Sequence, residues 1–323
     1  MKNDELYPRT DESNLQRIRR ALRETGVAGL ARRSARVGLT SFASYLEGAA
    51  QRLMDVEIEA CLTPEERDAI AANAELEDGH RGRRAFLIGN GPSLANLDLS
   101  LLQGELTFAV NAFWKHPLVP SLQPTYYTLT DDLYYDGSES SQKFFHDLTS
   151  RMISPTYFAP VLHRRRILEE NLLPAAHTRF IAKAGHLIHS ARPDVDLTRV
   201  LPSPGTVLMT SLMIATYLGA SPIYLIGADH DWLAHVDDGG HFYEGPTLDS
   251  QPELASDLTL GTYRYKLEYM RKLWKGYEIL RRLAASRGVT IANATDGGFL
   301  DVFPRVRYET LFAGNLSASA RSH

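Results

Sequence analysis

Cysteine is nearly absent from this chain, which carries only Cys61 among its 323 residues. A single cysteine excludes an internal disulfide framework and any zinc site built from several cysteines. It also favours a reducing compartment, so a soluble, cytoplasmic protein is expected. No run of about 18 apolar residues occurs, although a membrane-spanning helix would need one. The first residues, MKNDELYPRTDESN, contain no apolar stretch and do not predict a signal peptide.

An excess of positive charge is also missing. Lys and Arg number 35 against 39 Asp and Glu, which gives a net charge of −4. The chain therefore has no global basic field, and nucleic acid is not an expected partner. A hydrophobic fraction of 44% at this length is enough for one large domain or two small ones.

Positive charge is concentrated locally, in residues 11–37. Arginines alternate there with apolar residues at helical spacing, interrupted near Gly26 and Gly29. The pattern predicts an amphipathic helix with two open interpretations. It is either a solvated face packed on the main domain, or a peripheral contact with an acidic partner or the anionic inner face of a membrane.

The chain divides by pattern into three parts. Residues 1–80 predict a helical N-terminal extension, in which Thr63 and Glu66 form a capping box around Pro64. Residues 81–310 predict the catalytic domain, and residues 311–323 a disordered tail. A homo-oligomer is compatible with this organisation.

The main domain alternates short apolar runs with longer helical stretches. This alternation predicts an α/β fold of βαβ units, Rossmann-like, with a mostly parallel sheet and helices on both faces. The expected helices cover about 207–218 and 262–287, and 231–260 is expected to be a long loop of the functional-lid kind. The candidate strands are Ala85–Gly89, Leu106–Val110, Thr125–Leu129, Arg179–Ala182, Ile223–Ile226 and Thr290–Ala292.

A glycine-containing loop follows the first candidate strand. It consists of Gly89, Asn90, Gly91, Pro92 and Ser93. Open α/β sheets bind ligands at this position, and glycines let a backbone approach a phosphate. The loop lacks the third glycine of GxGxxG and the lysine of GxxxxGK[ST], so it is neither of the usual nucleotide loops. A tight strand-to-helix turn is the alternative.

The next two candidate strands also end in polar residues. Asn111 follows the second, and Thr130 and Asp131 follow the third. The carboxyl ends of parallel strands meet at one edge of a sheet. Three successive strands therefore predict a polar rim that could hold a ligand.

Histidines and aspartates gather after the strand Ile223–Ile226. Gly227 and Ala228 lead into Asp229, His230 and Asp231, and His241 follows in the long loop. One interpretation is general acid–base catalysis by a histidine oriented by a carboxylate. A second is a divalent metal, Mg or Mn, held by Asp229, His230 and Asp231. A third is a polar surface loop.

Four motifs in order carry a resemblance: GNGPSL, VNAF, YLGASPIYLIGAD and NATDGG. Together they resemble the 6-hydroxymethylpterin diphosphokinase-like domain family, which includes the motility-associated-factor flagellin glycosyltransferases. The first three also resemble bacterial CMP-sialic acid-dependent sialyltransferases. The resemblance covers roughly residues 84–305. GNGPSL and the LGA…GAD segment are fairly specific together, and each is weak alone.

The resemblance implies a donor site. It implies that Asn90 and Asn111 contact the CMP portion, that Thr130 or Asp131 adds a contact, and that Thr206 reaches the donor. Gly227, which lies beside this rim in the predicted sheet, is also expected to bind the donor.

The resemblance also implies a histidine base within a His-Tyr-x-x-His pattern. This sequence has the first histidine, His241, and lacks the second. His230 is the next candidate, with Asp229 or Asp231 to orient the base.

The expected function is therefore glycosyl transfer. The sugar, a nonulosonic or ulosonic acid if the donor is CMP-linked, would move onto a bacterial surface polysaccharide or glycoprotein glycan. A CMP donor needs no metal, whereas a nucleoside diphosphate sugar would bring Mg or Mn to the aspartates. One alternative is Mg-dependent diphosphate transfer to a hydroxymethylpterin-like substrate, disfavoured because no Lys or Arg stands beside Gly89–Ser93. The other is a non-catalytic nucleotide-binding scaffold of polysaccharide assembly.

Overall fold

The computed structural model describes residues 56–190, 193–234 and 263–313, with a few helical positions between 39 and 53. The chain divides into two units, Met1–Ala50 and Gln51–His323. The sheet, the helices α2 to α6 and the pockets discussed below belong to the larger unit. The basic segment 11–37 lies outside the described residues, as do residues 314–323 of the predicted tail.

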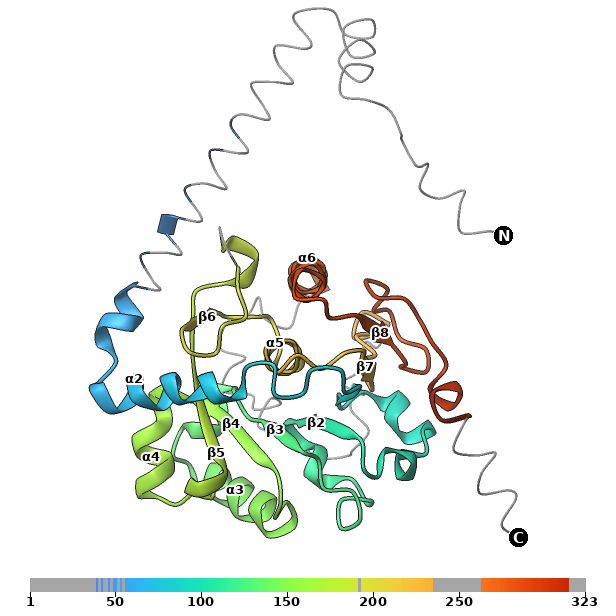
Figure 1. Cartoon of the computed structure of the whole chain (residues 1–323), viewed down its shortest axis with the longest axis horizontal. Helices are drawn as coiled ribbons and strands as arrows, with labels where there is room; N and C mark the ends of the chain where they lie inside the picture. Colours follow the sequence, from blue (N-terminus) through green and yellow to red (C-terminus); the bar gives the residue numbers. More distant parts are fainter. Residues whose placement is uncertain are drawn as a thin grey trace, which may run out of the picture. The chain divides into compact units, whose positions relative to one another are not determined.

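Eight parallel strands form one sheet in the order β6-β5-β4-β3-β2-β1-β7-β8 (Figure 1). This confirms the predicted α/β class with a parallel sheet. The strands are β1 (Ala85–Ile88), β2 (Leu106–Val110), β3 (Tyr126–Thr128), β4 (Thr156–Pro160), β5 (Thr178–Ala184), β6 (Val200–Pro202), β7 (Ile223–Ile226) and β8 (Ile291–Asn293).

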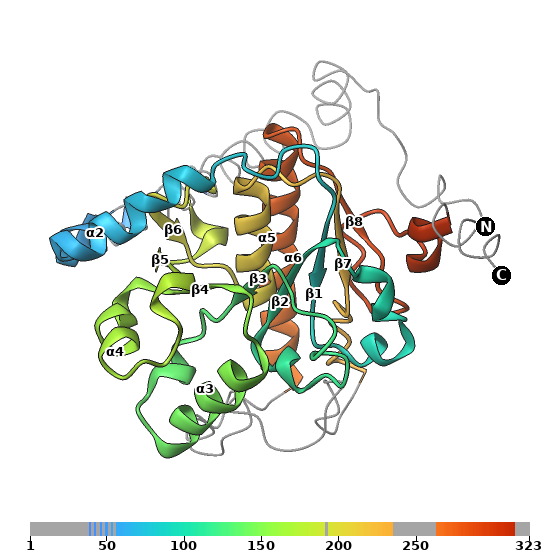
Figure 2. The ribbon, with the colours of Figure 1, turned by 60° about the horizontal axis from the view of Figure 1, so that its bottom comes forward.

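Helices cover both faces of this sheet, as predicted. The helices are α2 (Pro64–Ala71), α3 (Glu139–Arg151), α4 (Arg164–Glu169), α5 (Val207–Tyr217) and α6 (Tyr263–Ser286). Figures 1 and 2 show α5 and α6 together on one face, with α3 and α4 on the other. None of the helices in the described part of the chain is long and apolar enough to cross a membrane.

The core has two halves because side chains alternate along each strand. In β1, Ala85 and Leu87 join the half beneath α5 and α6. Phe86 and Ile88 join the opposite half. All four are fully buried. Helix α5 is mostly apolar and is buried on every side from Leu208 to Tyr217, since it lies between the sheet and α6.

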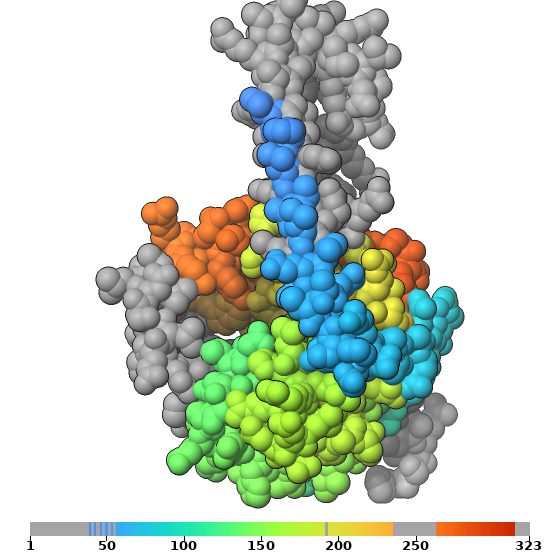
Figure 3. All heavy atoms as spheres, turned by 90° about the vertical axis from the view of Figure 1, so that its left-hand side faces the viewer, coloured from blue at the N-terminus to red at the C-terminus, as the bar shows by residue number. Residues whose placement is uncertain are grey.

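Helix α2 begins as predicted, with the complete capping box of Thr63 and Glu66. It packs against β5 and the segment after β4, as the blue and yellow-green atoms of Figure 3 show. Just after it, the buried Asn73 donates from Nδ2 to the carbonyls of Phe180 and Leu197, at 2.8 and 3.1 Å. Residues 64–76, assigned above to the N-terminal extension, therefore pack as part of the larger unit.

The order of the strands locates the ligand site. From β1 the chain moves outward strand by strand to β6, and then returns to place β7 on the other side of β1. Open α/β sheets bind ligands where this reversal occurs, beyond the carboxyl ends of the strands. Here that point lies between β1 and β7.

Candidate functional site

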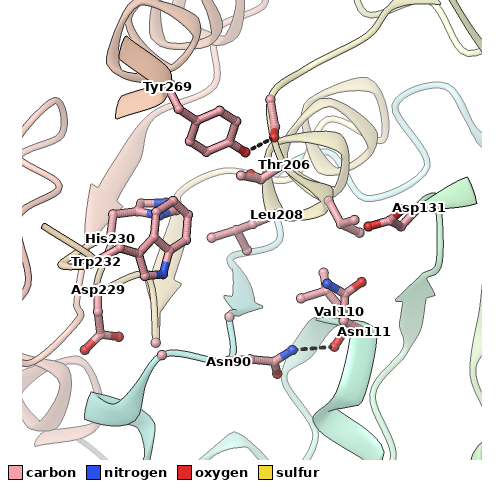
Figure 4. A pocket seen from close by; sticks show the side chains of 15 residues that line it. Asn90, Val110, Asn111, Asp131, Thr206, Leu208, Asp229, His230, Trp232 and Tyr269 are labelled. Atoms are coloured by element: carbon pink, nitrogen blue, oxygen red, sulfur yellow. Dashed lines mark hydrogen bonds between the residues drawn. The ribbon is translucent and has the colours of Figure 1, made fainter. Parts of the chain in front are cut away.

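A pocket of about 320 Å³ opens at this reversal point (Figure 4). The loops after β1, β2, β3 and β7 line it, together with the start of α5 and Tyr269 of α6. The lining includes Gly89, Asn90, Gly91, Asn111, Asp131, Thr206, Gly227, Asp229 and His230. The structure thus brings most of the predicted site residues to one pocket, although they come from five separate segments of the chain.

The glycines after β1 are required by the neighbouring loop of the protein itself. The amide of Gly91 donates to the carbonyl of Gly227 at 2.9 Å. A Cβ at Gly89 would overlap that same carbonyl, and one at Gly91 would overlap the carboxylate of Asp229. From the sequence, these glycines were expected to let the backbone approach a phosphate. In the structure they let the β1 and β7 loops lie in contact.

Asp229 anchors the glycine loop. Its buried carboxylate accepts hydrogen bonds from the amide and the hydroxyl of Ser93, at 3.1 and 2.8 Å. Burial raises the pKa of Asp229, and the two bonds from Ser93 oppose that rise. Pro92, predicted as a donor residue, starts the short 3₁₀ turn that carries Ser93 and is not among the residues that line the pocket. These contacts make Asp229 a positioning residue for the loop.

Two asparagines contribute unpaired acceptors. The side chain of Asn90 is 8% exposed and donates from Nδ2 to the carbonyl of Val110 at 3.1 Å. Asn111 has a left-handed backbone, with φ of 47°. Among the described residues, the Oδ1 atoms of Asn90 and Asn111 have no hydrogen-bond partner. A ligand that donates hydrogen bonds fits such a surface.

His230 lies at the back of the pocket in a cage of aromatic rings. It is 7% exposed, and its ring packs against Trp232, Trp274 and Tyr277. Its Nε2 lies 2.7 Å from the hydroxyl of Tyr277. Burial lowers the pKa of His230 to about 4, with Asp231 opposing the shift. The imidazole is therefore neutral at pH 7 and has the protonation state of a base.

The N-terminus of α5 forms another wall. Thr206 caps the helix by accepting from the amide of Met209 at 3.3 Å. Val207 and Leu208 line the pocket, and the first amides of a helix have no partner within it. The hydroxyl of Tyr269 donates to the carbonyl of Gly205 at 2.5 Å. The positive end of the helix dipole is thus directed at the ligand space.

The rim after β3 is more complex than the sequence indicated. Thr130 is buried, and its carbonyl accepts from Nζ of Lys183 at 2.5 Å. Asp131 uses Oδ1 to accept from the amide of Leu133 at 3.2 Å. The sequence analysis missed Lys183, which stands one residue past the predicted strand Arg179–Ala182. The sequence did contain one indication of its role, because Lys183 is a cationic residue directly after a predicted strand.

Two further predictions concern the base His241 and the metal site. His241, the first candidate base, lies outside the described residues, as does most of the loop 231–260. For the metal interpretation, the described parts of the chain contain no group of three or more His, Cys, Asp or Glu side chains arranged to hold an ion.

No family model matches the chain, and no curated protein matches it significantly. The likeness to the diphosphokinase-like and sialyltransferase families therefore stays a resemblance of motifs. The function has to be inferred from the pocket.

Proposed function

We propose that this protein is a glycosyltransferase that uses a nucleotide-activated sugar, with a CMP-linked donor favoured. Asn90 carries the proposal. Its side chain lines the pocket at the reversal point of the sheet, yet its buried Oδ1 lacks a partner within the described chain. An unpaired buried acceptor costs about 1–3 kcal/mol. The amino group of a base or the hydroxyls of a ribose would supply the missing donor.

The donor phosphate would lie at the N-terminus of α5. Free amides at Val207 and Leu208 and the helix dipole favour an anion there. Thr206, which the resemblance connects with the donor, is the N-cap of this helix. A single phosphate can leave as CMP without a metal, which agrees with a rim built mainly from neutral polar groups.

Aromatic side chains support a sugar as the other part of the donor or as the acceptor. Trp232 and Tyr269 border the pocket on the side opposite Asn111 (Figure 4). Their ring centroids are 6.1 Å apart. The apolar face of a pyranose packs well on such rings, while its hydroxyls bond to polar neighbours.

His230 is the described candidate for the base that removes the proton of the acceptor hydroxyl. In the tautomer whose Nε2–H donates to the hydroxyl of Tyr277, the lone pair for accepting a proton is on Nδ1 of His230. The charge of Asp231 raises the pKa of His230, whereas Asp229 is occupied by Ser93. Asp231 is thus the better orienting partner, and His241 stays the other candidate base.

One observation favours the diphosphokinase alternative more than the sequence did. Lys183 brings a cation to the rim near Asp131, although no Lys or Arg stands beside Gly89–Ser93 in the sequence. Phosphoryl transfer uses such cations together with Mg²⁺. The same lysine also suits a glycosyltransferase whose donor has more than one anionic group.

A thermal-shift panel separates these functions. CMP, CDP, UDP, GDP and ATP are added with and without Mg²⁺. A nucleotide present at 100 times its Kd should add about 2.7 kcal/mol to the unfolding free energy. Stabilisation by CMP without metal, followed by turnover of a CMP-linked sugar, supports glycosyl transfer. If only ATP with Mg²⁺ stabilises the protein, glycosyl transfer is refuted. If nucleotides bind but no turnover occurs, the protein is a non-catalytic nucleotide-binding scaffold.

A further inference from the structure

Lys183 is a partly buried cation that has no ion-pair partner in the described part of the chain. It lies at the carboxyl end of β5, where its ammonium donates one hydrogen bond, to the carbonyl of Thr130. Among the described residues, no carboxylate forms an ion pair with it within 4.0 Å. An ammonium has three donor hydrogens. A charge in this position is costly to bury unless it is paired.

The nearest carboxylates are committed elsewhere. Asp132 pairs with His163, whose Nε2 lies 2.9 Å from Oδ1 of Asp132. Asp131 caps the 3₁₀ turn Asp132–Tyr135 by accepting from the amide of Leu133. Burial lowers the pKa of Lys183, and the two carboxylates oppose that shift from a distance. Neither carboxylate replaces a direct partner for the ammonium.

The space beside Lys183 adjoins the main pocket. A second hollow of about 170 Å³ is lined by Lys183, Thr130, Thr210, Pro204 and Asp132, whose carboxylate pairs with His163. It shares Asp131, Gly205, Thr206 and Val207 with the main pocket. A ligand whose phosphate lies at the start of α5 can therefore extend a further group toward Lys183.

We propose that Lys183 binds a second anionic group of the donor, beyond the phosphate placed at the N-terminus of α5. This inference rests on the proposed function. The group is a second phosphate if the donor is a nucleoside diphosphate sugar. It is a carboxylate if the donor is a CMP-linked acidic sugar. Both offer oxygen acceptors to an ammonium, and such charge-assisted hydrogen bonds are stronger than neutral ones.

The test compares ligands that differ by one anionic group. Calorimetry measures Kd for CMP, CDP and CMP-linked sialic acid on the wild type, on Lys183→Met and on Lys143→Met. Lys143 is the matched control, because it is an exposed lysine of α3 paired with Asp147 at 2.7 Å. The wild type should bind CDP or CMP-sialic acid about tenfold more tightly than CMP, a gain typical of one charge-assisted bond.

Lys183→Met should abolish that preference and leave the Kd of CMP within about twofold of the wild type, since the lost bond belongs only to the extra group. Lys143→Met should retain the preference. A preference for CDP identifies a phosphate as the group, and one for CMP-sialic acid identifies a carboxylate. Lys183→Arg keeps the charge and should keep the preference for the ligand with the extra anionic group. This variant is measured in place of Lys183→Met if the latter does not fold.

Several results would overturn the inference. If Lys183→Met weakens CMP as much as the other ligands, the lysine only supports the pocket. If it changes no Kd, or if the wild type shows no preference, Lys183 contacts no second anion. Each of these three results leaves the proposed function unaffected, provided that CMP binds. If none of the ligands binds the wild type, the proposed function and the inference fail together.

Discussion

Replacing Asn90 by leucine tests the donor site directly. Leucine has nearly the shape of asparagine and no polar atoms. The change removes the bond from Nδ2 to the carbonyl of Val110 and also removes the unpaired Oδ1. The first loss costs about 1 kcal/mol, and the second relieves about 1–3 kcal/mol, although the carbonyl of Val110 loses its donor. The free protein should therefore keep its unfolding free energy within about 1 kcal/mol, or about 2–4 °C in Tm.

Binding should respond much more strongly. A ligand donor left facing leucine loses its bond and is desolvated without compensation, at about 1.4–2.8 kcal/mol, which is a tenfold to hundredfold rise in the Kd of CMP. At a CMP concentration of 100 times the wild-type Kd, the wild type gains about 2.7 kcal/mol. The variant should gain only about 0.4–1.4 kcal/mol under the same conditions. Thermal denaturation with and without CMP measures both quantities.

Asn73 provides the matched control. It too is a buried asparagine with an unpaired Oδ1, but it lies under α2 and its Nδ2 bonds two backbone carbonyls. Asn73→Leu should destabilise the protein by about 1 kcal/mol more than Asn90→Leu, because two carbonyls lose their donor instead of one, and it should leave the Kd of CMP unchanged. The reasoning is refuted if Asn90→Leu binds CMP like the wild type. It is refuted as well if that variant loses as much stability as Asn73→Leu.

Four further predictions concern other parts of the molecule. Gly91→Ala should lower both stability, by about 1–3 kcal/mol, and CMP affinity, because the new Cβ displaces Asp229; a normal urea midpoint would contradict this. Ser93→Ala should cost about 1.5–3 kcal/mol, since one of two bonds to a buried carboxylate is lost, and urea unfolding measures it. His230, with a folded pKa of about 4 against 6.5 unfolded, adds about 3 kcal/mol of stability above pH 6.5 that is lost as the pH falls toward 4; His230→Asn, compatible with φ of 47°, should remove that part of the pH dependence. Deleting residues 1–40 should reduce binding to anionic liposomes if the basic segment contacts membranes, and unchanged flotation would exclude that role.

Periodicity in the sequence identified most of the sheet. All six predicted strands correspond to strands of the structure, and 207–218 and 262–287 closely match α5 and α6. The two strands that were missed both end in proline. β4 ends at Pro160 and follows Pro155, and β6 is only Val200–Pro202. Proline weakens a strand pattern, but both segments lie toward the β6 edge of the sheet, where other contacts decide their conformation.

The site was predictable in composition but not in its internal contacts. Polar residues after parallel strands had to meet at one edge, and Asn90, Asn111 and Asp131 do line one pocket. Which of them bond each other depends on side-chain geometry that spacing does not encode. The bonds from Ser93 to Asp229 span 136 residues. The pairing of Lys183 with the carbonyl of Thr130 was equally invisible, because it joins strands that are not neighbours in the sheet.

The contact between the loops that follow β1 and β7 has a consequence for biosynthesis. Strand β1 pairs with β7 from Ala85 to Ile223, 138 residues later, and the β7 loop is itself held by Thr295 and by Phe299. A ribosome adding about 5–20 residues per second needs on the order of ten seconds to cover that interval. Meanwhile one edge of β1 has no partner strand, which exposes the nascent chain to wrong pairing. A truncated chain that ends before residue 295 would lack the contacts of Thr295 and Phe299 with the β7 loop. Ligand binding should therefore require a chain that has been translated past β8.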